Sequence, residues 1–382
     1  HDRAIALRPR EPLNYVDRGA TYCERGSLDR GIADCDQAID LDPVCASAYH
    51  QRGLAYYAAG KLELSLADFD QAIELYSKPF DKGTAYSNRG LVWKALGRSA
   101  AALDDYTRAI ALLPGGAGQA MAYHNRGLAN YQLGAMEAAL ADYDRAIAML
   151  PDSHEKAFAF NNRGLAHKER GDLKAAVADY GRAIALNGQD PTVFCNRGNA
   201  LRALGELEAA IADYDQAIGL SSNATDRATA HSRRGLVRLD QRHLDDAIAD
   251  QNEAILILPD GPERARSLSN RGLARAAQGD LTGAIGDYDQ ANALDPEYAA
   301  PYNNRGLALF QLGEKERAIA DFDRAVSKSP GFAAAFHNRG LVRYDLGDVA
   351  GAIQDYDQAV ALFDDGPDRA AAYSNRALAR RA

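Results

Sequence analysis

A tripeptide, Asn-Arg-Gly or a close variant of it, recurs along the entire chain of 382 residues. Its glycine returns at ten positions, and Ala377 holds the eleventh. The intervals are 34 or 37 residues, so two repeat lengths are mixed. A regular period of this size predicts a stack of similar units, each resting on its neighbours, rather than one globular core. The ten glycines are Gly19, Gly53, Gly90, Gly127, Gly164, Gly198, Gly235, Gly272, Gly306 and Gly340.

Each repeat carries further fixed positions around its glycine. An aromatic residue stands four positions before it in most copies, as in Tyr86 and Phe160. A second glycine follows seven positions later in nine of ten copies, and an alanine follows nineteen positions later in all ten. Apolar residues spaced by three, four and seven on both sides of the second glycine predict two amphipathic helices, the first of which ends at that glycine. Each repeat is therefore expected to be a helical hairpin, and the fold class is all-α.

The pattern also includes a closing proline in five copies. An early aromatic, a small residue between the helices and a final proline resemble the tetratricopeptide repeat family. The resemblance covers essentially the whole chain. It implies an alpha-solenoid of antiparallel helix pairs, wound as a right-handed superhelix with a concave groove that binds proteins or peptides. The closing prolines are Pro114, Pro151, Pro259, Pro296 and Pro330.

We expect residues 1–382 to form a single array. Residues 1–9 are interpreted as the second helix of a truncated repeat, 10–366 as ten complete helix pairs, and 367–382 as the first helix of a further repeat. Both ends therefore look truncated, as in a fragment of a larger protein. In the longer repeats the distance from glycine to alanine is unchanged, so the three extra residues should let the next first helix begin about one turn early.

Two oppositely charged residues recur together. Arginine precedes the repeat glycine in all eleven copies, and aspartate follows it by fifteen positions in all ten. Helical spacing places both on stripes that pack together, where an unpaired charge is costly and an Arg–carboxylate pair satisfies both groups. We predict Arg–Asp bridges within or between adjacent repeats. Two alternatives to these bridges are that both residues lie on ordinary solvent-exposed faces, or that the arginines bind an anionic ligand. The named candidates are Arg89, Arg126, Arg163 and Arg197 with Asp105, Asp142, Asp179 and Asp213.

Asparagine occupies the position two before the glycine in eight of eleven copies. This position lies about 160° around the first helix from its packing face. In a stacked array, that side of the first helices lines the concave surface. The row resembles the asparagine ladder of the repeats in O-linked N-acetylglucosamine transferase, a resemblance that implies binding of an extended peptide backbone. The alternative is that each amide bonds the neighbouring first helix. The predicted groove residues are Asn88, Asn125, Asn162, Asn196, Asn270, Asn304 and Asn338, beside a leucine row that includes Leu273 and Leu307.

The middle of the predicted groove is locally basic. Lys168, Arg202, Arg233 and Arg266 approach the concave side by helical position. The repeat around Gly235 is the most irregular, since Arg233 replaces asparagine and Arg242 replaces the second glycine. Two interpretations compete, a site for acidic residues of a partner and a weaker stack or hinge.

Nothing in the sequence indicates catalysis. A glycine-rich phosphate loop, a metalloprotease HExxH motif and a nucleophile elbow are all missing. The histidines are scattered, and His50, His124 and His337 are expected to lie on an exposed row. None of the four cysteines forms a CxxC pair, so no metal site is expected. We therefore expect no enzymatic activity and no cofactor.

Charge and hydropathy narrow the expected partners. A net charge of −9 argues against binding to nucleic-acid phosphates, and no apolar run approaches the length of a membrane span. The expected function is a cytoplasmic, non-catalytic scaffold that binds an extended peptide or protein. Two alternatives are a regulatory or substrate-selecting region of a larger enzyme, and an array that associates end to end through its cut repeats.

Overall fold

The computed structural model describes residues 1–382 and contains 22 α-helices and no strand. The prediction of an all-α array of antiparallel helix pairs is confirmed. The first helices of the repeats are α2 (Pro12–Glu24), α4 (Ala46–Ala58), α6 (Pro79–Ala95), α8 (Ala117–Gln132), α10 (His154–Glu169), α12 (Pro191–Ala203), α14 (Ala224–Asp240), α16 (Pro262–Gln278), α18 (Ala299–Gln311), α20 (Ala333–Asp345) and α22 (Pro367–Ala379). The second helices are α1 (Asp2–Leu7), α3 (Leu28–Leu41), α5 (Leu62–Leu75), α7 (Ser99–Leu112), α9 (Met136–Met149), α11 (Leu173–Leu186), α13 (Leu207–Leu220), α15 (Leu244–Ile257), α17 (Leu281–Leu294), α19 (Lys315–Lys328) and α21 (Val349–Leu362).

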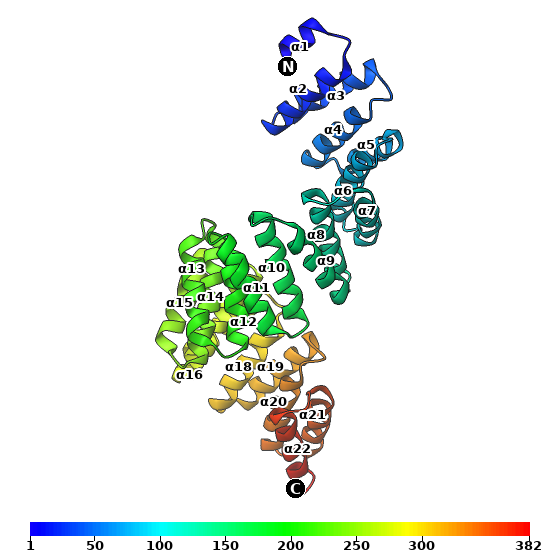
Figure 1. Ribbon diagram of the computed structural model, residues 1–382. Helices are drawn as coiled ribbons and strands as arrows, with labels where there is room; N and C mark the ends of the chain where they lie inside the picture. Colours follow the sequence, from blue (N-terminus) through cyan, green and yellow to red (C-terminus); the bar gives the residue numbers. More distant parts are fainter. The chain divides into compact units, whose positions relative to one another are not determined.

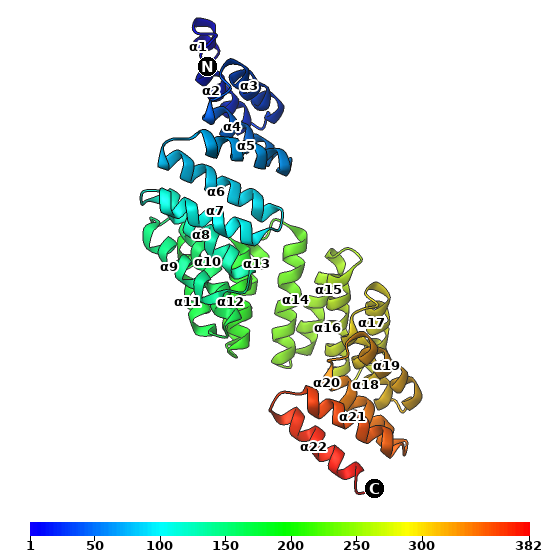
Figure 2. The same cartoon turned by 90° about the vertical axis from the view of Figure 1, so that its right-hand side faces the viewer.

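The helices gather into two compact units, His1–Gln189 and Asp190–Ala382. Within each unit a helix packs against the next one in the chain, and each first helix also contacts the first helix of the neighbouring pair. Figure 1 labels the successive helices, and Figure 2 shows α15, α16 and α17 side by side in the second unit. That residues 1–382 form one continuous array stays a prediction. None of the helices has the length and apolar character that a membrane crossing requires.

The longer repeats place their extra residues at the start of the first helix. Helix α6 in a 37-residue step has 17 residues, whereas α4 in a 34-residue step has 13. Pro79 occupies the first turn of α6, where its missing N–H leaves no hydrogen bond unmade. The expected early start is confirmed, and the added turn leaves the packing face pointing in nearly the same direction.

The repeat glycine permits a close crossing between the two helices of a pair. An added Cβ at Gly164 would lie 2.8 Å from Cε1 of Tyr180, which is fully buried. The second glycine has a different use, because it ends the first helix in the left-handed region, as at Gly205 with φ 79°. Arg242 stands at that position in the irregular repeat and is the one non-glycine residue with positive φ, at 64°. Every repeat therefore turns in the same way, including the one that lacks the favoured residue.

Candidate functional site

The arginine before the repeat glycine forms a bidentate salt bridge with the aspartate on the second helix of the same helix pair. Arg89 donates from Nε to Asp105 Oδ2 at 2.8 Å and from Nη2 to Asp105 Oδ1 at 2.6 Å. Asp105 is 1% exposed, and the hydrogen bonds it accepts raise the pKa of Arg89 above its usual value. The same arrangement joins Arg18–Asp34, Arg52–Asp68, Arg126–Asp142, Arg163–Asp179, Arg197–Asp213, Arg234–Asp250, Arg271–Asp287, Arg305–Asp321 and Arg339–Asp355.

A third bond runs from most of these arginines to the preceding repeat. Arg163 donates from Nη1 to Asp144 Oδ1 at 2.5 Å, and Asp144 lies two positions after the aspartate of the earlier pair. Threonine and asparagine accept this bond at Arg126 and Arg271. Each such arginine therefore joins three helices, which favours a structural role over capture of an anionic ligand. The aspartates that accept the bond are Asp2, Asp36, Asp70, Asp144, Asp215, Asp289, Asp323 and Asp357.

The early aromatic completes the surroundings of the arginine. The guanidinium carbon of Arg89 lies 5.3 Å from the centre of the Tyr86 ring, three residues earlier on α6. Equivalent contacts join Arg126 with Tyr123 and Arg163 with Phe160. A ring face attracts a cation, so the aromatic stabilises the charge on the side that the carboxylates leave open.

The asparagine row is half-buried, and several of its amides contact the preceding first helix. Asn88 Nδ2 lies 2.9 Å from His50 Nε2, and Asn162 Nδ2 lies at the same distance from His124 Nε2. Asn338 donates to Asn303 at 2.9 Å. Asn270 donates more weakly to Ser232 at 3.5 Å, and Asn375, outside the predicted set, lies 2.9 Å from His337. In these repeats the asparagine amide contacts the neighbouring first helix, which is the alternative given above to peptide binding.

Two members of the row differ from these. Asn125 makes no hydrogen bond with the protein, and Asn304 accepts one from Asn303 Nδ2 at 3.1 Å through its Oδ1 while its own Nδ2 donates none. Both side chains are half-buried, so both amides retain hydrogen-bonding capacity at an accessible surface. Asn196 is also half-buried and lines a pocket between α12 and α14.

The expectation that His50, His124 and His337 lie on an exposed row is wrong. His124 is 8% exposed, and the His50 ring packs edge-on against Phe69 at 5.5 Å. Burial lowers the pKa of His50 and of His124 to about 4, so both rings are neutral at pH 7 and Nε2 can accept from asparagine. The error has a simple cause, because a helical wheel for one helix omits the next first helix, which covers this position.

The predicted basic positions are largely neutralised. Arg202 pairs with Asp240 at 2.7 Å, and Arg266 pairs with Glu263 at 2.9 Å. Lys168 lies 3.6 Å from Glu169. Only Arg233 of the four makes no ion pair, which leaves a single unneutralised cation in place of the expected group.

A small apolar pocket of about 110 Å³ lies between α16 and α18. Leu273 and Leu307 from the leucine row form part of its wall, with Tyr288 of α17 beside them. Asn304 lies on the same wall. The pocket therefore combines an apolar surface with an amide that has free donors.

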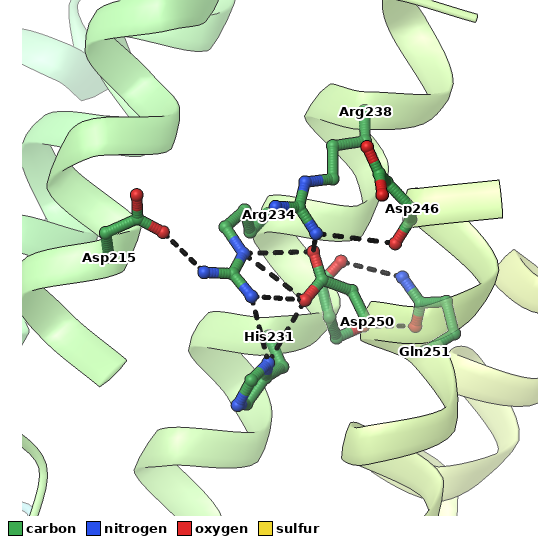
Figure 3. A network of polar contacts seen from close by, with 8 residues as sticks. Asp215, His231, Arg234, Arg238, Asp246, Asp250 and Gln251 are labelled. Atoms are coloured by element: carbon green, nitrogen blue, oxygen red, sulfur yellow. Dashed lines mark hydrogen bonds and ion pairs between the residues drawn. The ribbon is translucent and has the colours of Figure 1, made fainter. Parts of the chain in front are cut away.

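In the irregular repeat around Gly235, a network of polar contacts connects α14 with α15, as Figure 3 shows. Arg234, Arg238 and His231 all contact Asp250, with Arg238 at 2.9 Å and His231 Nδ1 at 3.1 Å. Burial alone would raise the pKa of Asp250, but the bond from His231 and the bonds and charge of Arg234 outweigh it and lower the pKa. Gln251, in place of the usual tyrosine, donates to the Ser232 carbonyl at 2.8 Å. Polar contacts thus fill the space that aromatic rings fill in the other repeats.

Comparison with known proteins agrees with this geometry. Models described as TPR repeat match residues 164–205 and 272–313, and models described as Tetratricopeptide repeat match 44–114, 88–154, 191–223, 299–332 and 337–382. The chain therefore consists of tetratricopeptide repeats over most of its length. No curated protein matches the sequence significantly.

Solved structures share the fold at low sequence identity. A tetratricopeptide repeat protein from Parabacteroides merdae is 18% identical, with a TM-score of 0.57 over 68% of this chain and 98% of that one. Yeast Tom70 is 16% identical, with a TM-score of 0.51 over 100% of this chain and 91% of its own. Identities this low establish a common architecture of repeated helix pairs.

Proposed function

We propose that this chain is a non-catalytic protein-interaction scaffold whose first helices bind an extended peptide segment of a partner. The observation that carries the proposal is the pocket formed by Leu273, Leu307 and Tyr288 with Asn304 on its wall. An apolar wall accommodates a side chain, while an adjacent amide bonds the peptide backbone whatever its sequence.

The hydrogen bonds around Asn304 support this role. Asn303 donates to the Oδ1 of Asn304 at 3.1 Å, which fixes the orientation of the amide and leaves Nδ2 to donate. A backbone carbonyl of an extended peptide is a suitable acceptor, since it would otherwise lose its bond to water on entering the groove. Asn125, which is half-buried in the first unit, also has an amide that can donate, although no neighbouring side chain orients it.

The remaining asparagines contribute differently in this proposal. The side chains of Asn88 and Asn162 are held by neutral histidines through Nδ2, and each retains a second N–H. Asn161 also donates to Asn162 Oδ1 at 3.3 Å. An amide held in place by a neighbour loses less conformational freedom when a ligand binds. The histidines thereby act as supports for the binding surface.

Peptide selection tests the proposal. A display library of short random peptides is selected on the full chain, and enriched peptides are measured by fluorescence anisotropy. Replacement of Asn304 by Ala should weaken their binding roughly 3- to 10-fold, the range for one hydrogen bond. Replacement of Glu253, which is exposed on α15 and forms no ion pair, should leave binding unchanged. A library without any enriched peptide would contradict the function.

Self-association is a second candidate, because α22 and the N-terminal region expose apolar side chains. Leu378 and Tyr373 are 56% and 43% exposed, and Leu7 and Leu13 are 77% and 51% exposed. Apolar surface of this kind promotes contact between copies. Sedimentation velocity across a concentration series tests this candidate, and a single monomeric species at all concentrations would exclude it.

A further inference from the structure

A second pocket in the second unit has a different chemistry. It lies between α12 and α14, near the end of α13, and has a volume of about 160 Å³. Most of the residues that line it have polar side chains, among them Thr192, Asn196, Asp226, Thr229 and Arg233, with Cys195 beside them. Two of these side chains, Asp226 and Arg233, carry opposite charges, so the pocket is not suited to a purely apolar ligand.

Arg233 stands where most repeats have asparagine, and its guanidinium makes no ion pair. Cys195 lines the same pocket, and burial raises the pKa of its thiol, so the sulfur is uncharged and a weak acceptor for the guanidinium. The neighbouring arginines differ, since Arg234 is bonded to Asp250 and Arg202 to Asp240. Arg233 is half-buried and retains most of its five donors for another group.

Asp226 is the matching anion on the same helix. It is exposed in the first turn of α14 and forms no ion pair or hydrogen bond with the protein. Its charge is favourable near a helix N-terminus, but that interaction leaves the carboxylate open to a ligand cation. Seven residues separate Asp226 from Arg233, about 10.5 Å along the helix, so the two charges do not neutralise each other.

We propose that this pocket binds an extended peptide segment that carries an acidic and a basic side chain two residues apart, the acid against Arg233 and the base against Asp226. The proposal rests on the peptide-binding function above and specifies the partner's chemistry at one place. Alternate side chains of an extended chain point the same way and lie about 7 Å apart. Flexible glutamate, lysine or arginine side chains span the remaining distance between the two charges.

The opposite charges distinguish this ligand from others. A lone anion such as inorganic phosphate would be attracted by Arg233 and repelled by Asp226 within one pocket. A segment with both charges satisfies both groups, and only one chain direction does so for a given order of charges. The pocket therefore selects the direction of the peptide as well as its composition.

Peptides enriched on the full chain test the assignment. We expect peptides with an acidic and a basic residue two positions apart to be enriched, and Arg233→Glu to weaken their binding by about 10-fold or more. Arg233→Lys keeps the charge and should retain part of the affinity. Asp226→Lys combined with Arg233→Glu should favour peptides with the reverse order of charges. The matched controls are Arg145→Glu and Glu253→Lys, which alter exposed residues without ion pairs.

The outcomes separate the two proposals. Enriched peptides that lack the charged pair, or that bind the Arg233→Glu variant equally well, would overturn the pocket assignment. If their binding still depended on Asn304, the proposed function would stand. Circular dichroism of each variant establishes that lost binding reflects lost contacts rather than unfolding.

Discussion

Arg163 on α10 donates two hydrogen bonds to Asp179 on α11, one to each carboxylate oxygen. Asp179 is 2% exposed, so removing the arginine would leave a buried carboxylate without its main cation. We expect Arg163→Ala to lower the free energy of unfolding by roughly 2–4 kcal/mol in urea titrations. Arg145→Ala, at an exposed position, should change it little. Equal stability of the two variants would show that the pair contributes nothing.

The third bond of Arg163 should contribute less. Its acceptor Asp144 has a side chain that is 62% exposed, so solvent screens the interaction and supplies replacement bonds. Asp144→Asn should cost under about 1 kcal/mol, and Asp179→Asn distinctly more. Thermal unfolding of both variants in one buffer compares them. A larger loss for Asp144→Asn would reverse our ranking of the two contacts.

Arg242 offers a stabilising substitution. It holds φ at 64°, a conformation that costs a non-glycine residue roughly 1–2 kcal/mol, and its side chain is exposed. Arg242→Gly should raise the free energy of unfolding by about 1 kcal/mol, because glycine adopts this conformation without the steric cost but gains entropy when unfolded. The converse change, Gly205→Ala, should destabilise the equivalent turn. Urea titration of both variants measures the opposite signs, and a less stable Arg242→Gly protein would refute the argument.

The buried histidines predict an acid-sensitive stability. The pKa of His124 is about 4 in the folded chain against an ordinary value of 6.5. Above pH 6.5 both states hold the ring neutral and the contribution is complete. Between pH 6.5 and about 4, the ring is protonated in the unfolded chain but stays neutral in the folded chain. The free energy of unfolding therefore falls as the pH is lowered through this range, by roughly 3 kcal/mol in total.

His124→Gln provides the comparison for this effect. Glutamine does not titrate, so the variant should lose less stability than the parent chain between neutral pH and about pH 4.5. Carboxylate titration affects both proteins and cancels in the difference. Melting temperatures across this range supply the measurement, and identical pH profiles would mean that His124 is not shielded from protonation.

Local spacing in the sequence predicted the helix pairs and the early start of α6, because both depend on neighbours within one repeat. Bridges between adjacent repeats were predicted as one alternative, but Asp144 was not identified as the acceptor for Arg163, since this acceptor position belongs to the preceding repeat and varies among aspartate, threonine and asparagine. A search for pairing between successive repeats would have found it. The burial of His50 was missed for the same reason, as the covering helix is one repeat away.

The pockets were harder to foresee. Asn88 and Asn304 occupy the same sequence position, yet the first contacts a histidine and the second lies on a pocket wall with its donors free. The difference depends on which residue stands three positions before the glycine of the preceding repeat. A repeat pattern averages over such differences, so it identifies the row without ranking its members.

The arginines that join three helices also determine how each unit should unfold. Opening one helix pair breaks a charged bond to the pair before it, so neighbouring pairs lose stability together. In a linear stack this raises the interface energy relative to the intrinsic energy of a repeat. Thermal fluctuations should then unfold several helix pairs together within a unit. A bound peptide that crosses adjacent first helices would also stabilise neighbouring pairs that it does not contact.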